Sequence, residues 1–472
     1  MCVVFWLGVY LPVWAQVDLD RFQRKLGQIQ RETRLIAQPD IPIDQRALID
    51  YGGYVTFNFL AADDTNQRTH VLRQTDRNGY LLVNFDGVHE FFLRARSSYR
   101  DFNAGDSFDS HGDDLVGPTL DRAHYRFDLQ RYVAAYEGRT IPDKLIVQGG
   151  RQLVHWANGL TLSQEIDGAV AQLGHELFTL DIMAGVMRDS SVDIDSSRPD
   201  FANETNRNFY GAMFSIGIDP RHRPYVYGLV QRDKNPSDVL VTGSITTRFK
   251  YDSYYIGWGS TGTFGDNLIY GIEFVYQGGE GLSNSFDSAT EDNIPQTMED
   301  VEAFAMDLRF DYLFNDNHHT RLSAEFVMAT GDTDRSLHTT DTFGGNESGT
   351  EDHAFNAFGL VDAGLAFNPN VSNLLMVRAG SSTFPWPNSV LLHRLQVGMK
   401  FLVFNKLNRD APINELTANS SFLGWETDLY ANWQVTSDMT IVVRYGVFFP
   451  GAAIAVDHDS RHFVFTGVTF AF

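Results

Sequence analysis

The sequence predicts an all-β protein, a transmembrane, antiparallel, up-and-down β-barrel of about 18 strands with a short N-terminal periplasmic helix. Three observations support this prediction. Apolar and polar residues alternate along segment after segment from about residue 50 to the C-terminus. The connections between these segments alternate between short and long. The chain ends on HFVFTGVTFAF, an aromatic strand with a terminal Phe472.

Composition limits the classes of protein to which the chain can belong. It has 472 residues, a formal charge of −23 and 43% apolar residues, which is too apolar for a disordered chain. Nucleic-acid binding requires a basic face, so the acid excess argues against it. The single cysteine excludes a disulfide scaffold and a Cys-based zinc site. Beyond residue 15, no stretch has the roughly 18 uncharged apolar residues of a membrane-spanning helix.

The N-terminal residues predict export. Segment 1–15 is uncharged and has the length of a signal-peptide apolar core, with small residues that favour cleavage before Gln16. The alternative is a buried N-terminal strand. Cys2 lies inside this segment, so we expect a mature chain without cysteine. Segment 16–48 is predicted to be periplasmic and helical, because apolar residues within 18–38 recur at steps of three and four.

The remainder, 49–472, reads as strands. In one example Phe304, Met306 and Leu308 alternate with polar or small residues. A soluble half-buried sheet gives the same alternation. The length of the alternating pattern and the aromatic residues near strand ends favour a membrane barrel, in which every backbone group is paired. The predicted strands are 51–62, 71–84, 88–102, 119–136, 144–155, 163–173, 176–188, 207–218, 223–234, 244–261, 267–279, 300–314, 319–331, 372–383, 389–404, 423–435, 438–449 and 461–472.

The connections set the orientation and the strand number. Turns such as Asp86-Gly87 are short, whereas 103–118, 189–206, 281–299 and 332–353 are long. Outer-membrane barrels have short periplasmic turns and longer outer loops. A nineteenth candidate strand, 355–366, would break this alternation. We therefore assign 353–370 to a large outer loop, with inward folding as an option.

The inward face of the predicted wall is rich in basic residues. They have two interpretations: ion pairs with inward acids that stiffen the wall, or a constriction selective for anions. Arginine dominates, and its planar fork binds carboxylates bidentately. Arg378 lies on the same predicted face. The candidate pore-lining residues from this pattern are Arg94, Arg96, Arg122, Arg126, Arg309, Arg321, Arg394, Lys400 and Arg444.

The predicted outer loops hold most of the net charge. Segments 101–114, 189–206, 280–300 and 332–352 contain 22 acidic residues against two arginines, a charge of −20. These residues form either a solvated surface or Ca²⁺ sites, since Ca²⁺ prefers oxygen ligands. Asp193/Asp195 and Asp332/Asp334 are the best local pairs, and Ca²⁺ could bridge the loops to lipopolysaccharide. No other cofactor is expected.

No catalytic motif is present. The sequence lacks a G-x-S-x-G elbow, an H-E-x-x-H helix and a P-loop. His353 and His462 are near the predicted outer rim, but no nucleophile motif accompanies them. We therefore expect a protein that is not an enzyme.

Several motifs resemble a known family. They are the run Gln148-Gly149-Gly150-Arg151-Gln152-Leu153, with Asn158-Gly159-Leu160 and Asp167-Gly168-Ala169, the loop segment 353–362, and the C-terminal Gly424-Trp425-Glu426-Thr427-Asp428 and Phe449-Pro450-Gly451. Together with Phe472 they resemble the alginate-export outer-membrane porins. The resemblance implies an eighteen-stranded barrel with an arginine-rich conduit, and it adds Arg151 of the Gly-Arg-Gln motif to the candidate substrate-binding residues. The chain departs from the family in the short turn 435–438, where a long periplasmic plug loop is expected, and in the added 18–38 helix.

These observations give one leading function and two alternatives. The leading function is passive passage of an anionic, alginate-like polysaccharide or another acidic solute across the bacterial outer membrane. The alternatives are a general or nutrient-specific uptake porin and a non-conducting structural barrel. The expected partners are outer-membrane lipid and lipopolysaccharide, the barrel-assembly machinery and a periplasmic export partner.

Overall fold

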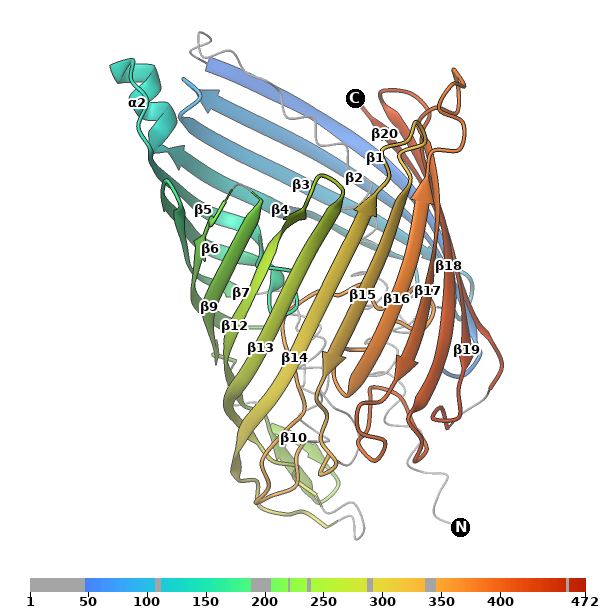
Figure 1. The fold of residues 1–472 in the computed structure, drawn as a ribbon. Coiled ribbons are helices and arrows are strands. Elements are labelled where there is room, and N and C mark those ends of the chain that lie inside the picture. The colour runs from blue at the N-terminus through green and yellow to red at the C-terminus, as the bar shows by residue number, and fades with distance from the viewer. Residues whose placement is uncertain are drawn as a thin grey trace.

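The computed structural model of the chain describes residues 47–106, 112–187, 205–219, 221–235, 239–286, 292–335, 345–455 and 458–472. Eighteen antiparallel strands form one sheet that closes on itself as a barrel, which confirms the predicted fold class (Figure 1). The predicted signal peptide and the 18–38 helix lie outside the described residues. Within the described residues, no helix has the length and apolarity needed to cross a membrane.

The barrel strands follow the predicted ranges closely. They are β1 (Ala47–Asp63), β2 (Thr69–Phe85), β3 (His89–Phe102), β4 (Asp114–Asp128), β5 (Asp143–His155), β6 (Ser163–His175), β7 (Phe178–Met187), β8 (Arg207–Ile216), β9 (His222–Asp233), β12 (Tyr251–Phe264), β13 (Leu268–Leu282), β14 (Met298–Leu313), β15 (Arg321–Ala329), β16 (Leu374–Thr383), β17 (Leu395–Asn405), β18 (Phe422–Gln434), β19 (Met439–Pro450) and β20 (Arg461–Ala471).

The aromatic C-terminal strand closes the barrel. β20 pairs with β19 on one side and with β1 on the other, where Tyr54 lies opposite Ala471. The backbone of Phe472 exchanges two hydrogen bonds with Gly53, of 2.9 and 3.0 Å. Closure leaves no free sheet edge between the first and last strands, as a bilayer requires.

Side chains alternate between lipid and lumen along each strand. On β12, Tyr254, Ile256 and Trp258 are exposed on the outer face, while Ser253 and Tyr255 are buried inside. A strand with an apolar outer face and a mixed inner face satisfies both surroundings.

The two ends of the barrel differ in their connections. The short turns 86–88, 176–177, 265–267 and 435–438 lie at the end that also holds the C-terminus, at the top of Figure 1. The long connections β7–β8, β13–β14 and β15–β16 lie at the opposite end, while the connection from β4 to β5 is the longest one at the short-turn end. In outer-membrane barrels the short-turn end faces the periplasm, so we refer to the two ends as periplasmic and outer.

Three predicted strands were wrong at one end, and one of them, 389–404, begins six residues before β17, because residues 389–394 form a turn. The prediction 119–136 joins β4 to what the structure shows as a helix, α2 (Leu129–Glu137). Asp128 caps this helix by accepting a hydrogen bond from the Arg131 N–H, and this local bond favours a helix start over continued strand. The prediction 244–261 merges β12 with part of a separate hairpin, β10 (Val239–Thr242) and β11 (Ile245–Arg248), in the outer connection.

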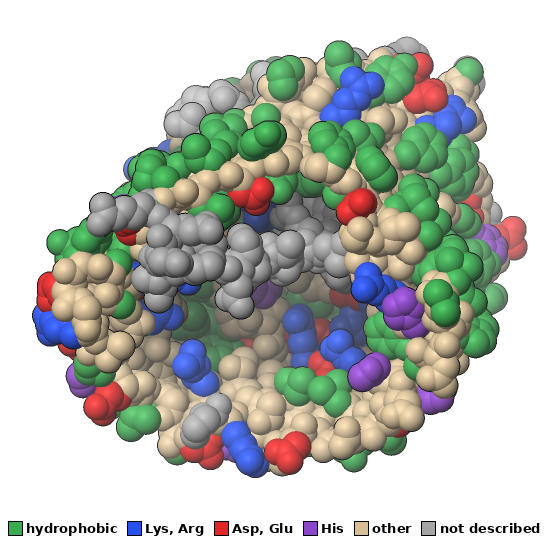
Figure 2. Space-filling model, turned by 90° about the horizontal axis from the view of Figure 1, so that it is seen from above, with side chains coloured by type: hydrophobic (Ala, Val, Ile, Leu, Met, Phe, Trp, Pro, Cys, Tyr) green, Lys and Arg blue, Asp and Glu red, His purple; other side chains and the backbone are tan. Residues whose placement is uncertain are grey.

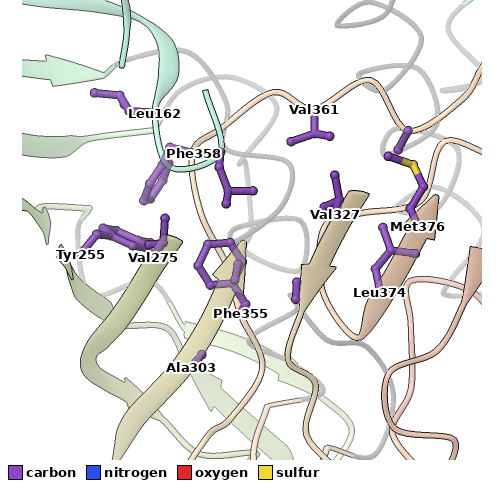
Figure 3. Close-up of a cluster of buried hydrophobic side chains, with 14 of the residues drawn as sticks. Leu162, Tyr255, Val275, Ala303, Val327, Phe355, Phe358, Val361, Leu374 and Met376 are labelled. Carbon is purple, nitrogen blue, oxygen red and sulfur yellow. The ribbon is translucent and has the colours of Figure 1, made fainter. Parts of the chain in front are cut away.

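Part of the lumen is occupied by a connecting segment of the protein itself. Segment 353–370 folds inward, and Phe355, Phe358 and Val361 are buried against inward-facing wall residues such as Tyr255 and Val275 (Figure 3). This confirms that 353–370 is a loop segment rather than a nineteenth strand, and shows that it takes the inward option. We call it the inner segment.

Candidate pore

A cavity of about 480 Å³ lies beside the inner face of β14–β19. The inner segment supplies part of its wall through Leu360, Asp362 and Leu365. We call this cavity the chamber. Viewed from the periplasmic end, the molecule is hollowed, and basic and acidic side chains are visible inside it (Figure 2). The charged residues that line the chamber are Arg309, Arg321, Arg378, Lys400 and Arg444 against Asp311, Glu325, Asp362 and Asp428, that is, five bases and four acids.

Ion pairs hold most of these bases in place. Arg309 lies 2.6 Å from a Glu325 oxygen and 2.7 Å from Asp307. Arg378 contacts both Glu325 and Asp362, the latter at 2.7 Å. Alternation along neighbouring strands brings these side chains to one face, because Arg309, Glu325 and Arg378 are direct cross-strand partners. Fixed guanidinium groups of this kind present N–H donors without further ordering.

Tyr430 forms an aromatic surface in the chamber and lies close to one cation from each neighbouring strand, Lys400 of β17 and Arg444 of β19. The Arg444 guanidinium lies 5.2 Å from the ring centroid and the Lys400 ammonium 5.8 Å. Lys400 also pairs with Asp362 at 2.5 Å, and Arg444 donates to the Asn432 amide oxygen at 2.7 Å. An aromatic face flanked by N–H donors can contact both the apolar and the acidic parts of a polar solute.

A second basic group lies on β3–β5, apart from the chamber residues. Arg94 donates to both Asp121 oxygens at 2.8 Å, and Arg96 donates to buried Asp76 at 3.0 Å. We call this group the second wall. The remaining pairs of the second wall are Arg151–Asp167 at 2.7 Å, Arg122–Glu165 at 3.8 Å and Arg126–Asp128 at 3.9 Å.

The tip of the β5–β6 hairpin leaves the wall at Arg151. The ladder between β4 and β5 ends at Ala123–Arg151, and that between β6 and β7 ends at Asp167–Val186. Gly150 makes the close approach to β4 possible. Its φ is +128°, and a Cβ there would lie 2.1 Å from the Ala123 oxygen. Arg151 therefore marks the base of an inward-turning hairpin.

Two wall glutamates bind the inward-folded elements through backbone N–H groups. Glu426 accepts hydrogen bonds from Ala366 at 2.7 Å and Phe367 at 2.9 Å, and from Leu365. Glu273 accepts from Asn158 at 2.9 Å in the hairpin tip. Both side chains are fully buried. They are acceptors for the loops rather than charges exposed to solute.

The predicted candidates therefore separate into three places. Arg309, Arg321, Lys400 and Arg444 meet in the chamber, while Arg94, Arg96, Arg122, Arg126 and Arg151 belong to the second wall. Arg394 is exposed near the periplasmic turn before β17, outside the chamber lining. Arg378, which also belongs to the predicted inward face, lines the chamber as well. Tyr430 was missed because alternation alone does not separate a chamber aromatic from a lipid-facing one.

The acidic pairs considered for Ca²⁺ have different outcomes. Asp193 and Asp195 lie outside the described residues. Asp332 is buried, and its carboxylate accepts N–H hydrogen bonds from Asp334 at 2.7 Å and His353 at 2.5 Å. Among the described residues, no group of three or more acidic, His or Cys side chains is arranged to hold a metal ion.

Comparison with known proteins assigns the family. A model of the alginate export family matches residues 147–465. The chain belongs to the alginate export family. No curated protein matches it in sequence.

Solved structures similar to this alginate export family barrel come from Pseudomonas aeruginosa. OccK5 (OpdH) superposes with a TM-score of 0.51 at 11% identity, over 90% of this chain and 98% of the other. OccK11 (OpdR) superposes with a TM-score of 0.50 at 11% identity, over 90% of this chain and 96% of the other. OccK7 (OpdD) superposes with a TM-score of 0.50 at 10% identity, over 90% of this chain and 98% of the other. The solved structures share the fold of this chain. As a member of the alginate export family, the chain is an outer-membrane β-barrel channel, and the family is one of transport rather than catalysis.

Proposed function

We propose that the protein provides a passive path across the outer membrane for an alginate-like anionic polysaccharide or another acidic solute, and that the basic residues of the chamber and second wall contact it. The observation that supports this most directly is the chamber itself. Five basic side chains face four acids around a polar cavity, and Tyr430 offers a ring between two of the bases. Rings of basic side chains favour anions in pores.

The path requires movement of the inward-folded elements. The hairpin tip and the inner segment are hydrogen-bonded to each other, from the Phe358 N–H to the Thr161 carbonyl at 3.0 Å and from the Leu360 N–H to the Gly159 carbonyl at 2.9 Å. A polymer that crosses the barrel has to displace these two elements from the lumen. We infer that the Glu273 and Glu426 contacts set how readily this happens.

Planar-bilayer recordings test the proposal. We expect a reversal potential that shows anion preference in a KCl gradient, and block of the current by uronate oligomers. The variants Arg321→Gln and Lys400→Gln should reduce both the anion preference and the block by uronate oligomers, because each substitution removes one positive charge from the chamber. Arg221→Gln is the matched control, since Arg221 is exposed in the β8–β9 turn and pairs with Asp266 at 3.7 Å. A cation preference that the two chamber variants leave unchanged would exclude the proposal.

The second candidate function is uptake of a small acidic nutrient. The volume of the chamber, about 480 Å³, and the apolar packing on its outer side favour a small solute over a long polymer. A uronate monomer and a uronate octamer can be compared as blockers of the current at the same concentration of carboxylate groups. Equal block by the two would favour this candidate. Stronger block by the octamer would favour the polysaccharide.

A further inference from the structure

The short helix α2 is fixed along the periplasmic rim of the barrel. It joins β4 to β5, and Gly138 ends it with a φ of +65°. Three contacts hold it: the Tyr136 hydroxyl donates to Asp86, the Arg131 guanidinium donates to the Gly87 carbonyl at 3.3 Å, and Val133 is buried. Asp86 and Gly87 form the turn between β2 and β3. The orientation of α2 is therefore set by the wall beside it (Figure 1).

An unbroken series of aromatic rings runs from the outer face of the wall onto α2. The register pairs Phe91 with Tyr125 and His89 with Phe127, which places all four on one face of the sheet. Phe85 and Phe91 are exposed there, 43% and 47%. The successive centroid distances are 6.4 Å for Phe85–Phe91, 4.9 Å for Phe91–Tyr125, 6.1 Å for Tyr125–His89, 5.6 Å for His89–Phe127, 6.1 Å for Phe127–Tyr132 and 4.9 Å for Tyr132–Tyr136.

The two tyrosines share one face of the helix because they are four residues apart. Both are exposed, Tyr132 by 38% and Tyr136 by 52%, although each is large and partly apolar. Tyrosine is enriched where lipid meets water, because its ring is apolar and its hydroxyl is polar. The rings that lead to Tyr132 lie at the periplasmic ends of lipid-facing strands, where a barrel has its aromatic girdle.

We propose that α2 is an interfacial anchor that places Tyr132 and Tyr136 among the phospholipid headgroups of the periplasmic leaflet. The ring series fixes the depth of the tyrosine face, since Phe127 contacts Tyr132 directly and lies on the lipid-facing side of β4. The anchor extends the girdle sideways along the membrane surface over β2–β4. Its occupant is lipid rather than a periplasmic protein, because the apolar contact surface is continuous with the surface that lipid already covers.

The charges around the helix agree with this occupant. Residues 128–144 contain three acids (Asp128, Glu137, Asp143) and three bases (Arg131, Arg139, Lys144), so their net charge is zero. Arg139 pairs with Glu137 at 2.7 Å and Arg131 with Asp128 at 3.6 Å. A neutral segment has no electrostatic preference for a charged partner. Contact with the interface therefore depends on the aromatic rings and should not depend on salt.

Site-directed spin labels test the anchor. The only cysteine is Cys2, so in a Cys2→Ser background Tyr132→Cys and Glu137→Cys place single labels on different faces of α2. The full-length protein is folded into vesicles of phosphatidylethanolamine and phosphatidylglycerol, and power saturation compares oxygen with a water-soluble nickel chelate. We expect the Tyr132 label to favour oxygen, as a label at lipid-facing Leu93 does, and the Glu137 label to favour nickel.

The same measurement can overturn the proposal. Equal nickel accessibility at positions 132 and 137 would place the tyrosine face in water or against a soluble partner. A pattern that changes between 0.1 and 1 M NaCl would replace the aromatic anchor with an electrostatic one. Heat-modifiable mobility on gels confirms folding of each variant. If Tyr132→Cys does not fold, Tyr136→Cys on the same face provides the same comparison.

Discussion

At the scale of the residue, Glu426 decides the position of the inner segment. It is fully buried in β18 and accepts three backbone N–H groups from Leu365, Ala366 and Phe367. A carboxylate offers only acceptors, whereas an amide replaces one oxygen with a donor group. Glu426 thus fits this cluster of N–H groups in a way that glutamine does not.

We predict that Glu426→Gln loosens the inner segment. The variant leaves at least one buried N–H without an acceptor, which costs about 1–3 kcal/mol of unfolding free energy. Single-channel recordings should show a larger mean conductance or more frequent openings, and urea unfolding should show the lost stability. Asp266→Asn, at an exposed periplasmic turn, is the control. Unchanged conductance together with unchanged stability would show that Glu426 does not hold the segment.

His353, at the start of the inner segment, should give the loop a pH dependence. Its ring N–H donates to the Glu302 carbonyl at 2.9 Å, and this bond, with the nearby charges of Asp332 and Glu351, raises its pKa above the ordinary 6.5. A raised pKa means that the stabilisation is complete below pH 6.5 and is lost as the pH rises through the folded-state pKa. Loop opening should therefore become more frequent as the pH rises through that value.

Titration of ¹³C-labelled histidine by NMR measures this pKa. We expect a midpoint for His353 above 6.5, and a lower midpoint in Glu351→Gln, because that substitution removes one of the charges that raise the pKa. The His353→Asn variant identifies the resonance and should remove the pH dependence of opening. A midpoint at or below 6.5 would contradict the assigned contacts.

At the scale of the element, the strands were predictable and the interior was not. Alternation of apolar and polar residues identifies a strand because the two faces of a barrel wall meet different surroundings. In β1, β9 and β12 this alternation extends over strands of 12 to 17 residues. α2 was missed because its start depends on one local bond from Asp128, which alternation does not report. The separation of the basic residues into chamber and second wall depends on where two loops fold. The periodicity of apolar and polar residues along the strands contains no information about the position of these loops.

The hairpin tip and the inner segment should act as one unit. Leu162 and Phe358 form a parallel bridge between them, flanked by hydrogen bonds. We predict that a disulfide formed in Leu162→Cys/Phe358→Cys locks the two elements and lowers the open probability at least several-fold. A reductant should restore it. Either single variant, treated with the same oxidant, is the control. Equal open probability in the oxidised and reduced forms would show that the elements need not separate for conduction.

At the scale of the whole molecule, charge is distributed unevenly along the barrel axis. Within the described residues, the four outer segments hold 13 acids against one arginine, Arg335, whereas the chamber has five bases against four acids. An anion that arrives from the periplasmic end meets the chamber bases first, and one that arrives from the outside meets the acidic loops. The electric field of the protein therefore differs between the two entrances.

We predict that this asymmetry rectifies the current. In symmetric 0.1 M KCl, currents at +100 and −100 mV should differ, with the larger current at the polarity that drives chloride from the periplasmic end outward. The Debye length falls from about 10 Å at 0.1 M salt to about 3 Å at 1 M, so screening should reduce the difference at 1 M. Glu347 and Glu351 are two exposed acids of the outer segment 332–352. Their substitution with glutamine should also reduce the difference between the two currents at 0.1 M KCl. Equal currents at both polarities in 0.1 M KCl would show that the outer acids do not reach the ion path, and that the acidic surface serves only the contact with solvent and neighbouring lipid.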